Sequence, residues 1–243
     1  MEKLHIEVRT IDNIRTMYIE GKAQSAMDVT NPTLAVFDYT KYFYVPLCLI
    51  AVKRALFIGG GGFSGPKIYA HHGIAVDAVE VNQEVVDIAK RQFALDTQTF
   101  NVFVEDGRAF LTQCSVSYDA IILDAFIAEK VPLQFTTFEF FTLVRKHLSE
   151  NGLLVFNVIS APELWFFQSL VRTLSSVFAS VLAFDLSPAA TQTRNIIIIA
   201  SPSKLNPTQV RKTCAQSTFD LAREMELFIE NVQTRRGEIL RDS

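Results

Sequence analysis

The chain has 243 residues, of which 49% are apolar and 20% are charged, with a formal net charge of −3 and twenty phenylalanines. This length and balance predict one large globular domain, or one domain with a small appendage, around an aromatic-rich core. A slightly acidic chain lacks the basic surface that nucleic-acid binding needs, and no apolar run is long enough to predict a membrane span.

The three cysteines, Cys48, Cys114 and Cys214, are far apart in the sequence. Their odd number and spacing favour reduced thiols in a cytoplasmic protein over a disulfide framework or a metal-binding knuckle. The adjacent pair His71 and His72 has no third ligand at metal spacing, so we expect surface histidines and no metal ion.

In chain order, residues 4–10 and 14–20 read as two strands around Asp12-Asn13, which predicts a β-hairpin. The polar stretch 21–33 is expected to be an irregular connection. We therefore expect a small N-terminal unit, residues 1–33, followed by a main domain, residues 34–243. That domain opens with an aromatic stretch, 34–51, which is expected to be helical in part and interrupted by Pro46.

Short apolar runs then alternate with helical patterns, which predicts a parallel sheet with helices on both faces. The later runs 180–186 and 195–200 show no helical pattern between them, so we expect antiparallel neighbours. The pattern Ser-Ala-Pro-Glu at 160–163 predicts a capping box that opens a helix to about residue 178. Asn206-Pro207 predicts the start of a last helix that ends near residue 236. The expected parallel strands are 55–58, 75–80, 101–104, 118–123 and 152–158.

Four consecutive glycines, Gly59 to Gly62, lie between the first of these strands and a helix predicted from residue 66. Glycine lacks Cβ, so the backbone can adopt positive φ and approach a ligand closely, next to the unpaired N–H groups of a helix N-terminus. The alternative is a tight turn with no ligand. Gly60, Gly62 and Gly65 match the spacing G-x-G-x-x-G, which taken alone suggests a dinucleotide.

Carboxylates follow the second, third and fourth predicted strands: Glu80, Asp106 and Asp124. The carboxyl ends of parallel strands meet at one edge of a sheet, so these three side chains should surround one ligand. Glu80 is placed to accept from both hydroxyls of a ribose. This much negative charge favours a sulfonium nucleoside over a pyrophosphate, although Asp106 as a turn residue and Asp124 as a helix cap are the simpler alternatives.

From about residue 18 to 200, the chain resembles the spermidine synthases, the polyamine aminopropyltransferases. The resemblance rests on "GKAQSAMD", "ALFIGGGG", "VDAVEVNQEVVDIAK", "VEDGRAFL" and "YDAIILD", which occur in the family's order and spacing. It implies an α/β, Rossmann-like class I methyltransferase fold. The expected sheet has seven strands, mostly parallel with only the last antiparallel, and a small N-terminal β-hairpin accompanies it. It also implies a homodimer.

The resemblance further implies a co-substrate, either decarboxylated S-adenosylmethionine or S-adenosylmethionine, and a small amine as acceptor. Asp124 falls where the family keeps the carboxylate that deprotonates the amine. The residues expected to contact the co-substrate are Gln24, Gly59, Gly60, Gly61, Gly62, Glu80, Val81, Asp106, Gly107, Asp124 and Ala125.

The chain departs from the family at two charges. Gly62 replaces an Asp that pairs with the amine of the decarboxylated donor, and Ile127 replaces a second Asp that holds the polyamine. Glu129 and Glu139 are the nearest other acids, and both are more simply explained as solvated charges. Three hypotheses therefore stay open: a divergent aminopropyltransferase, an S-adenosylmethionine-dependent methyltransferase, and a non-catalytic nucleoside-binding relative.

Glycine at position 62 also bears on the choice of donor. An Asp there would repel the carboxylate of intact S-adenosylmethionine, whereas glycine leaves backbone N–H groups that can bind a carboxylate. The sequence therefore predicts weaker discrimination for the decarboxylated donor, or even a preference for the intact one.

Overall fold

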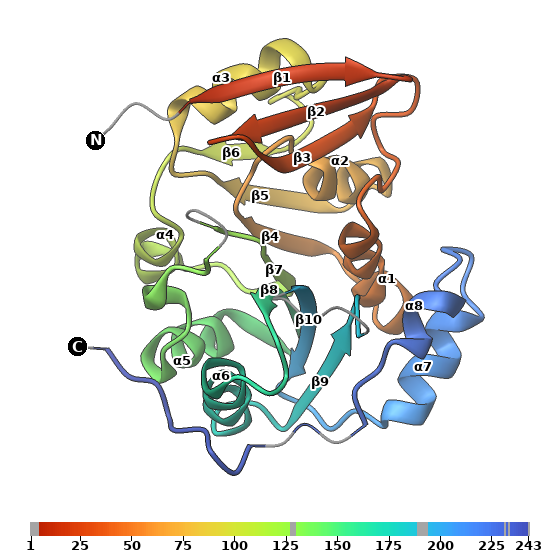
Figure 1. The fold of residues 1–243 in the computed structure, drawn as a ribbon. Coiled ribbons are helices and arrows are strands. Elements are labelled where there is room, and N and C mark those ends of the chain that lie inside the picture. Colours follow the sequence, from red (N-terminus) through yellow and green to blue (C-terminus); the bar gives the residue numbers. More distant parts are fainter. Residues whose placement is uncertain (1–4, 127–129, 189–193, 231, 233, 243) are drawn as a thin grey trace.

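The computed structural model describes residues 5–126, 130–188, 194–230, 232 and 234–242, and within them the main sheet has seven strands. Figure 1 shows this twisted sheet running through the molecule with helices on both sides. The strands follow the spatial order β6 (Asn101–Phe103), β5 (Ala75–Val79), β4 (Arg54–Ile58), β7 (Tyr118–Leu123), β8 (Leu148–Ser160), β10 (Arg194–Ser201) and β9 (Ser180–Asp185).

Strand directions confirm the predicted topology. The first five strands of this sheet in chain order, β4 to β8, are mutually parallel. Strand β10 is antiparallel to both of its neighbours, β8 and β9. The chain therefore reverses its direction in the sheet only at β10, and the carboxyl ends of β4, β5, β6 and β7 form one edge.

Successive residues of the central strands are buried on opposite faces, as expected of a sheet that is covered on both sides. In β4, Phe57 belongs to the core beneath α2 (Ser64–His71) and α3 (Gln83–Gln92). Ile58 belongs to the core on the other face, beneath α4 (Gly107–Gln113), α5 (Phe138–His147) and α6 (Trp165–Ser175). No helix in the described part of the chain is long and apolar enough to cross a membrane.

The N-terminal unit is a three-stranded antiparallel sheet of β1 (Ile6–Ile11), β2 (Ile14–Ile19) and β3 (Lys22–Asp28). The predicted hairpin is confirmed, but the expectation of an irregular connection after it was wrong, because residues 22–28 form β3. The pairing of β3 with β2 shifts between Met17 and Tyr18, so that Gln24 is left over as a bulged residue. A bulge of this kind turns side chains away from the regular alternation.

Two helix predictions also need correction. Ser160 lies at the end of β8, and α6 begins only at Trp165 with Leu164 as its N-cap residue, so residues 160–163 form no capping box. Strand β8 runs two residues beyond the predicted 152–158 and ends at Ser160, so the residue expected to cap a helix is still part of the sheet. Asn206 does cap α7 (Pro207–Ala215), but this helix is short and is followed by α8 (Ala222–Glu226) rather than by one long helix.

Two further segments frame the edge of the sheet. Residues 38–49 form a 3-10 helix, η1 (Asp38–Tyr44), and α1 (Val45–Leu49), which has Pro46 in its first turn, where a helix tolerates proline. The C-terminal segment passes α6 and α5 and returns toward α4 (Figure 1). There Leu240 accepts from the backbone N–H of Phe138 at 2.8 Å, and Asp242 pairs with Arg108.

Gly107, the first residue of α4, provides a test of this packing. A Cβ built on Gly107 would collide with Cγ2 of Ile58, at the end of β4. We expect Gly107→Ala to lower the free energy of unfolding by about 1–3 kcal/mol, the usual cost of overpacking a core. Urea unfolding of Gly107→Ala, Ile58→Ala and the double variant checks this. The double variant should lose less stability than the two single losses combined, and full additivity would contradict the contact.

Candidate functional site

The glycine turn connects β4 to α2 at the carboxyl edge of the sheet. Gly59 and Gly61 have positive φ values of 100° and 50°, and Phe63, directly before α2, also lies in the left-handed region with φ 56°. A Cβ on Gly59 would collide with the backbone carbonyl of Asp124. The glycine at this position therefore lets the ends of β4 and β7 meet, and it brings Asp124 to the turn.

Glu80, at the tip of β5, holds the turn from the other side. Its Oε2 accepts from the backbone N–H of Gly60 at 2.9 Å and of Gly61 at 3.4 Å, and its Oε1 accepts from the N–H of Asn82 at 2.9 Å. Each carboxylate oxygen has two lone pairs, so Oε1 keeps capacity for a further donor, such as a hydroxyl.

Ser25, on β3, closes the third side of the turn. Its Oγ accepts from the backbone N–H of Gly62 at 2.8 Å, and a Cβ on Gly62 would lie 2.6 Å from this oxygen and 2.8 Å from the ring of Phe93. The prediction that glycine at position 62 leaves N–H groups for a carboxylate was therefore wrong. The N–H groups of Gly60, Gly61 and Gly62 all donate to side chains of the protein itself.

Asp106, at the tip of β6, has two roles in the structure. Its Oδ1 caps α4 by accepting from the N–H groups of Arg108 and Ala109, each at 2.9 Å. Its Oδ2 accepts from the amide of Gln134 at 2.6 Å. Arg108 donates in turn to the carbonyl of Gln134 and pairs with Asp242, so the C-terminal segment supports this corner of the site.

Asp124, at the tip of β7, lies in a polar network contributed by three other elements. Its Oδ1 accepts from Asn157 Nδ2 at 2.8 Å, and Asn157 Oδ1 accepts from Asn195 Nδ2 at 2.8 Å. The hydroxyl of Tyr39, on η1, donates to the same carboxylate. The carboxylate is thus oriented by β8 and η1 as well as by its own strand.

Burial raises the pKa of Asp124 to about 6, against the smaller opposing effects of the hydrogen bonds from Asn157 and Tyr39. The pKa of Tyr39 is raised well above its ordinary value, first by burial and then by the charge of Asp124. At neutral pH the arrangement is an ionised carboxylate with a neutral phenol. Such a carboxylate has the pKa of a general base that works near pH 7.

The structure brings Gly59 to Gly62, Glu80 and Asp124 together and places Asp106 at the next strand tip of the same edge. Val81 and Val104, beside two of the acids, are 67% and 41% exposed and offer an apolar surface there. Gly107 is buried against Ile58, and Gln24 and Ala125 are partly buried next to Ser25 and Asp124. Ile127 and Glu129 lie outside the described residues.

Glu139 accepts from the backbone N–H of Asp242 at 2.9 Å and pairs with Arg241 at 3.1 Å, so its charge serves the C-terminal segment. In the parts of the chain that the structure describes, no three His, Cys, Asp or Glu side chains are grouped as a metal site requires.

Sequence reasoning missed Tyr39, Asn157, Ser25 and Gln134. Ser25 lies in the motif "GKAQSAMD", next to Gln24. The sequence does not show the β-bulge that turns Ser25 toward the glycine turn, so this contact was not predicted. Asn157 is a polar residue in the otherwise apolar run 152–158, which is a usable signal because a buried amide needs partners. Tyr39 lies among four other aromatic residues in residues 34–51, and nothing in the sequence distinguishes it.

Comparison with known proteins gives a consistent result. A family model described as the spermine/spermidine synthase domain matches residues 39–212. The chain is 35% identical over 107 residues to a probable polyamine aminopropyl transferase of Bifidobacterium longum, covering 43% of this chain and 24% of that protein. It is 29% identical over 185 residues to a polyamine aminopropyltransferase of Vibrio vulnificus, covering 74% of this chain and 60% of that protein. The chain thus spans less than two thirds of either relative.

Methyltransferases also match. The chain is 27% identical over 172 residues to an N-terminal histidine N-methyltransferase of Emericella nidulans, covering 66% of this chain and 30% of that protein. Among solved structures, a probable spermidine synthase of Corynebacterium glutamicum has a TM-score of 0.80 at 19% identity, over 100% of this chain and 94% of that one. Human methyltransferase-like protein 13, in complex with SAH, has a TM-score of 0.63 at 20% identity, over 78% and 93%. At these identities the structures show a shared fold.

The pKa of Asp124 leads to a stability prediction. The folded value of about 6 exceeds the reference value of 3.8, so the folded state binds this proton more tightly, and the contribution of Asp124 to stability falls as pH rises from about 4 to about 6. Asp124→Asn should therefore raise the free energy of unfolding at pH 7 by about 1–3 kcal/mol and by much less at pH 4. Urea unfolding at both pH values measures this, with the exposed Glu238→Gln as the control. Equal effects at both pH values would contradict the assignment.

Proposed function

The chain belongs to the spermine/spermidine synthase family, and we propose that it is a transferase that moves an aminopropyl group from decarboxylated S-adenosylmethionine to a small amine, with Asp124 as general base. The observation that carries this proposal is the Asp124 carboxylate, which is desolvated, has a pKa of about 6 and is held against the glycine turn by Tyr39 and Asn157. The relatives from Bifidobacterium longum and Vibrio vulnificus, which are named as a probable polyamine aminopropyl transferase and a polyamine aminopropyltransferase, support the same reaction class.

The residues at the edge of the sheet fit an adenosine-type co-substrate. Glu80 keeps acceptor capacity on Oε1 for a ribose hydroxyl, and Asp106 Oδ2 and the Gln134 amide lie where an adenine amino group can be recognised. Val81 and Val104 supply the apolar surface on which a flat base packs. The remaining candidates, Gln24, Gly59 to Gly62, Gly107 and Ala125, would shape the pocket through their small or polar groups.

When bound, the donor supplies a carbon that is activated by a positively charged sulfur. The acceptor amine arrives protonated, since alkylamines titrate near the pKa of lysine, about 10.4. Asp124 Oδ takes the proton that makes the amine nucleophilic, while Asn157 and Tyr39 fix the orientation of the carboxylate by donating to it. Burial from water keeps the base from being strongly solvated, and hydrogen bonds keep it ionised at neutral pH.

The choice of donor follows from charge. The N–H groups of Gly60 to Gly62 are already engaged by Glu80 and Ser25, so they offer nothing to the carboxylate of intact S-adenosylmethionine. That carboxylate would instead approach the ionised Asp124, which disfavours it. The decarboxylated donor lacks this charge, and this difference supports aminopropyl transfer.

Methyl transfer from S-adenosylmethionine is the second candidate. It is favoured by the match to an N-terminal histidine N-methyltransferase, and by Gly62 and Ile127 at the two positions where the family's acids are absent. Asp124 would serve as base for an amine in this reaction as well, so the donor separates the two candidates. A non-catalytic relative would have no need of the Asp124 network.

A calorimetric titration with decarboxylated S-adenosylmethionine, S-adenosylmethionine and methylthioadenosine tests the proposal. We expect the decarboxylated donor to bind more tightly than the intact one by about 1–3 kcal/mol, the range of one charged contact. Tighter binding of the intact donor would instead support the methyltransferase.

The control is Asp124→Asn, which should bind methylthioadenosine as the wild type does but lose turnover. In the wild type, kcat should rise with pH through about 6 and then level off, because the base must be ionised. A variant Asp124→Asn with normal turnover would reduce Asp124 to a structural group.

We further propose a cytoplasmic homodimer. The N-terminal sheet is small, and Ile11 at the end of β1 is 66% exposed, which suits burial against a second subunit. Static light scattering at micromolar concentration should give about twice the mass of the chain, whereas a clean monomer would contradict this assembly.

A further inference from the structure

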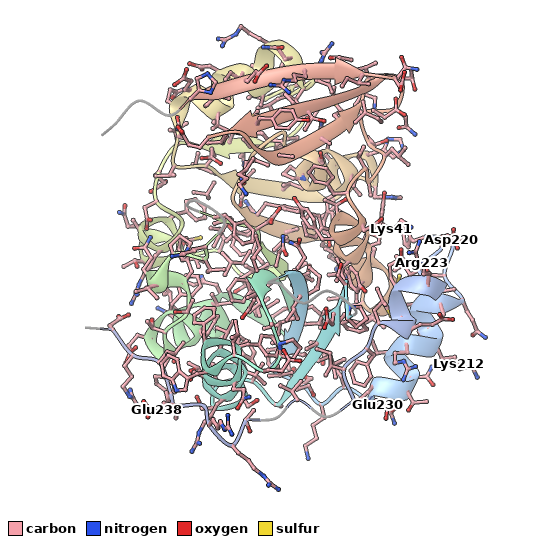
Figure 2. All side chains as sticks on the ribbon, viewed as in Figure 1. Lys41, Lys212, Asp220, Arg223, Glu230 and Glu238 are labelled. Atoms are coloured by element: carbon pink, nitrogen blue, oxygen red, sulfur yellow. The ribbon has the colours of Figure 1, made fainter. Side chains whose placement is uncertain are left out.

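A small recess lies where η1, the end of β9 and α8 meet. Its lining residues are Asp38, Tyr42, Leu186, Arg223, Glu224 and Leu227. Figure 2 shows Lys41, Asp220 and Arg223 gathered at this side of the molecule, next to α7 and α8. The recess has room for one group of the size of a water molecule.

Glu224, on α8, is the unusual member of this lining. The residue is only 5% exposed, and its Oε1 accepts from Lys41 Nζ at 2.8 Å. Its Oε2 is buried and has no hydrogen-bond partner among the described residues. A buried carboxylate oxygen without a donor costs free energy, so this oxygen calls for an N–H or O–H group from outside the chain.

The surroundings favour a positively charged partner. The pKa of Lys41 is raised by its hydrogen bond to Glu224 and by the charges of Glu224, Asp38 and Asp220. The pKa of Tyr42 is raised first by burial and then by Glu224, Asp38 and Asp185. Glu224, Asp38 and Asp220 thus place three carboxylates near the recess, against the two cations Lys41 and Arg223.

The chemistry favours an ammonium group over a metal ion. No three acidic, histidine or cysteine side chains of the described chain are grouped closely enough to ligate a metal. An ammonium group needs only two or three acceptors, and it has the size of the recess. Glu224 Oε2 and the carboxylate of Asp38 provide acceptors on two sides, from α8 and from η1.

The recess and the Asp124 network share one helical turn. Asp38 and Tyr42 face the recess, while Tyr39, the residue after Asp38, donates to Asp124. We propose that Glu224 and Asp38 bind the ammonium group of an alkylamine, a ligand class that rests on the proposed amine acceptor. A ligand bound there would hold η1 in place, and with it the Tyr39 side chain that donates to Asp124.

An NMR titration of the full chain with 1,4-diaminobutane and n-butylamine tests this site. Both amines should cause saturable shifts at the amides of η1 and α8. Tetramethylammonium has the charge but no N–H, so it should cause none. Glu224→Gln and Asp38→Asn should each weaken amine binding roughly ten- to a hundredfold, which is the range for a lost charge-assisted hydrogen bond.

Glu226→Gln, an exposed carboxylate on the same short helix, is the matched control and should bind as the wild type does. Methylthioadenosine binding, measured on every variant, reports whether the fold and the nucleoside site are intact. Wild-type affinity for amines in both Glu224→Gln and Asp38→Asn would overturn the proposed site. The absence of saturable shifts in the wild type would also overturn it, because water alone would then fill the recess. Neither result bears on the proposed aminopropyl transfer, which is tested separately by the nucleoside that is released during turnover.

Discussion

The close approach of two backbones, at Gly59 and at the carbonyl of Asp124, determines the geometry of the whole site. Asp124 N–H donates to Ile58 at 2.9 Å and Gly59 N–H donates to Val79 at 2.9 Å, so the ends of β7, β4 and β5 are bonded to one another directly at the turn. A side chain at position 59 would force the end of β7 away. The missing Cβ therefore lets Asp124 lie directly beside the turn, where Asn157 and Tyr39 donate to its carboxylate.

A consequence is that the glycine turn contributes shape rather than charge. The N–H groups of Gly60, Gly61 and Gly62 already donate to Glu80 and Ser25. The turn therefore offers no free donor, and the groups around it are carboxylates. The polar side chains at this edge are brought there by other elements: Tyr39 by η1, Asn157 by β8 and Ser25 by the bulged strand β3. The N-terminal sheet is thus part of the site's architecture, since it provides the acceptor that closes the turn.

Much of this architecture could be predicted from the sequence, because it depends on local pattern. Apolar runs that alternate with helical patterns predicted the parallel sheet. The four consecutive glycines predicted the turn after β4, and the acids that follow three strands predicted the edge where the candidate site lies. What could not be predicted depends on register and long-range contact. Strand β3 carries no alternating apolar pattern, so neither the strand nor its bulge was expected. The hydrogen bond from Gly62 N–H to Ser25 contradicts the expectation that this N–H is free for a carboxylate, and no local signal links residue 25 to residue 62. Ser160 matched a capping pattern but extends β8, since pairing with β10 outweighed the local preference.

The central claim is that Asp124 serves the transfer of an aminopropyl group at this edge. Chromatographic identification of the nucleoside released during turnover, with 1,4-diaminobutane as acceptor and both donors present, tests it most directly. The account predicts methylthioadenosine as the released nucleoside, and its loss in Asp124→Asn. Release of S-adenosylhomocysteine instead would contradict the account and establish methyl transfer.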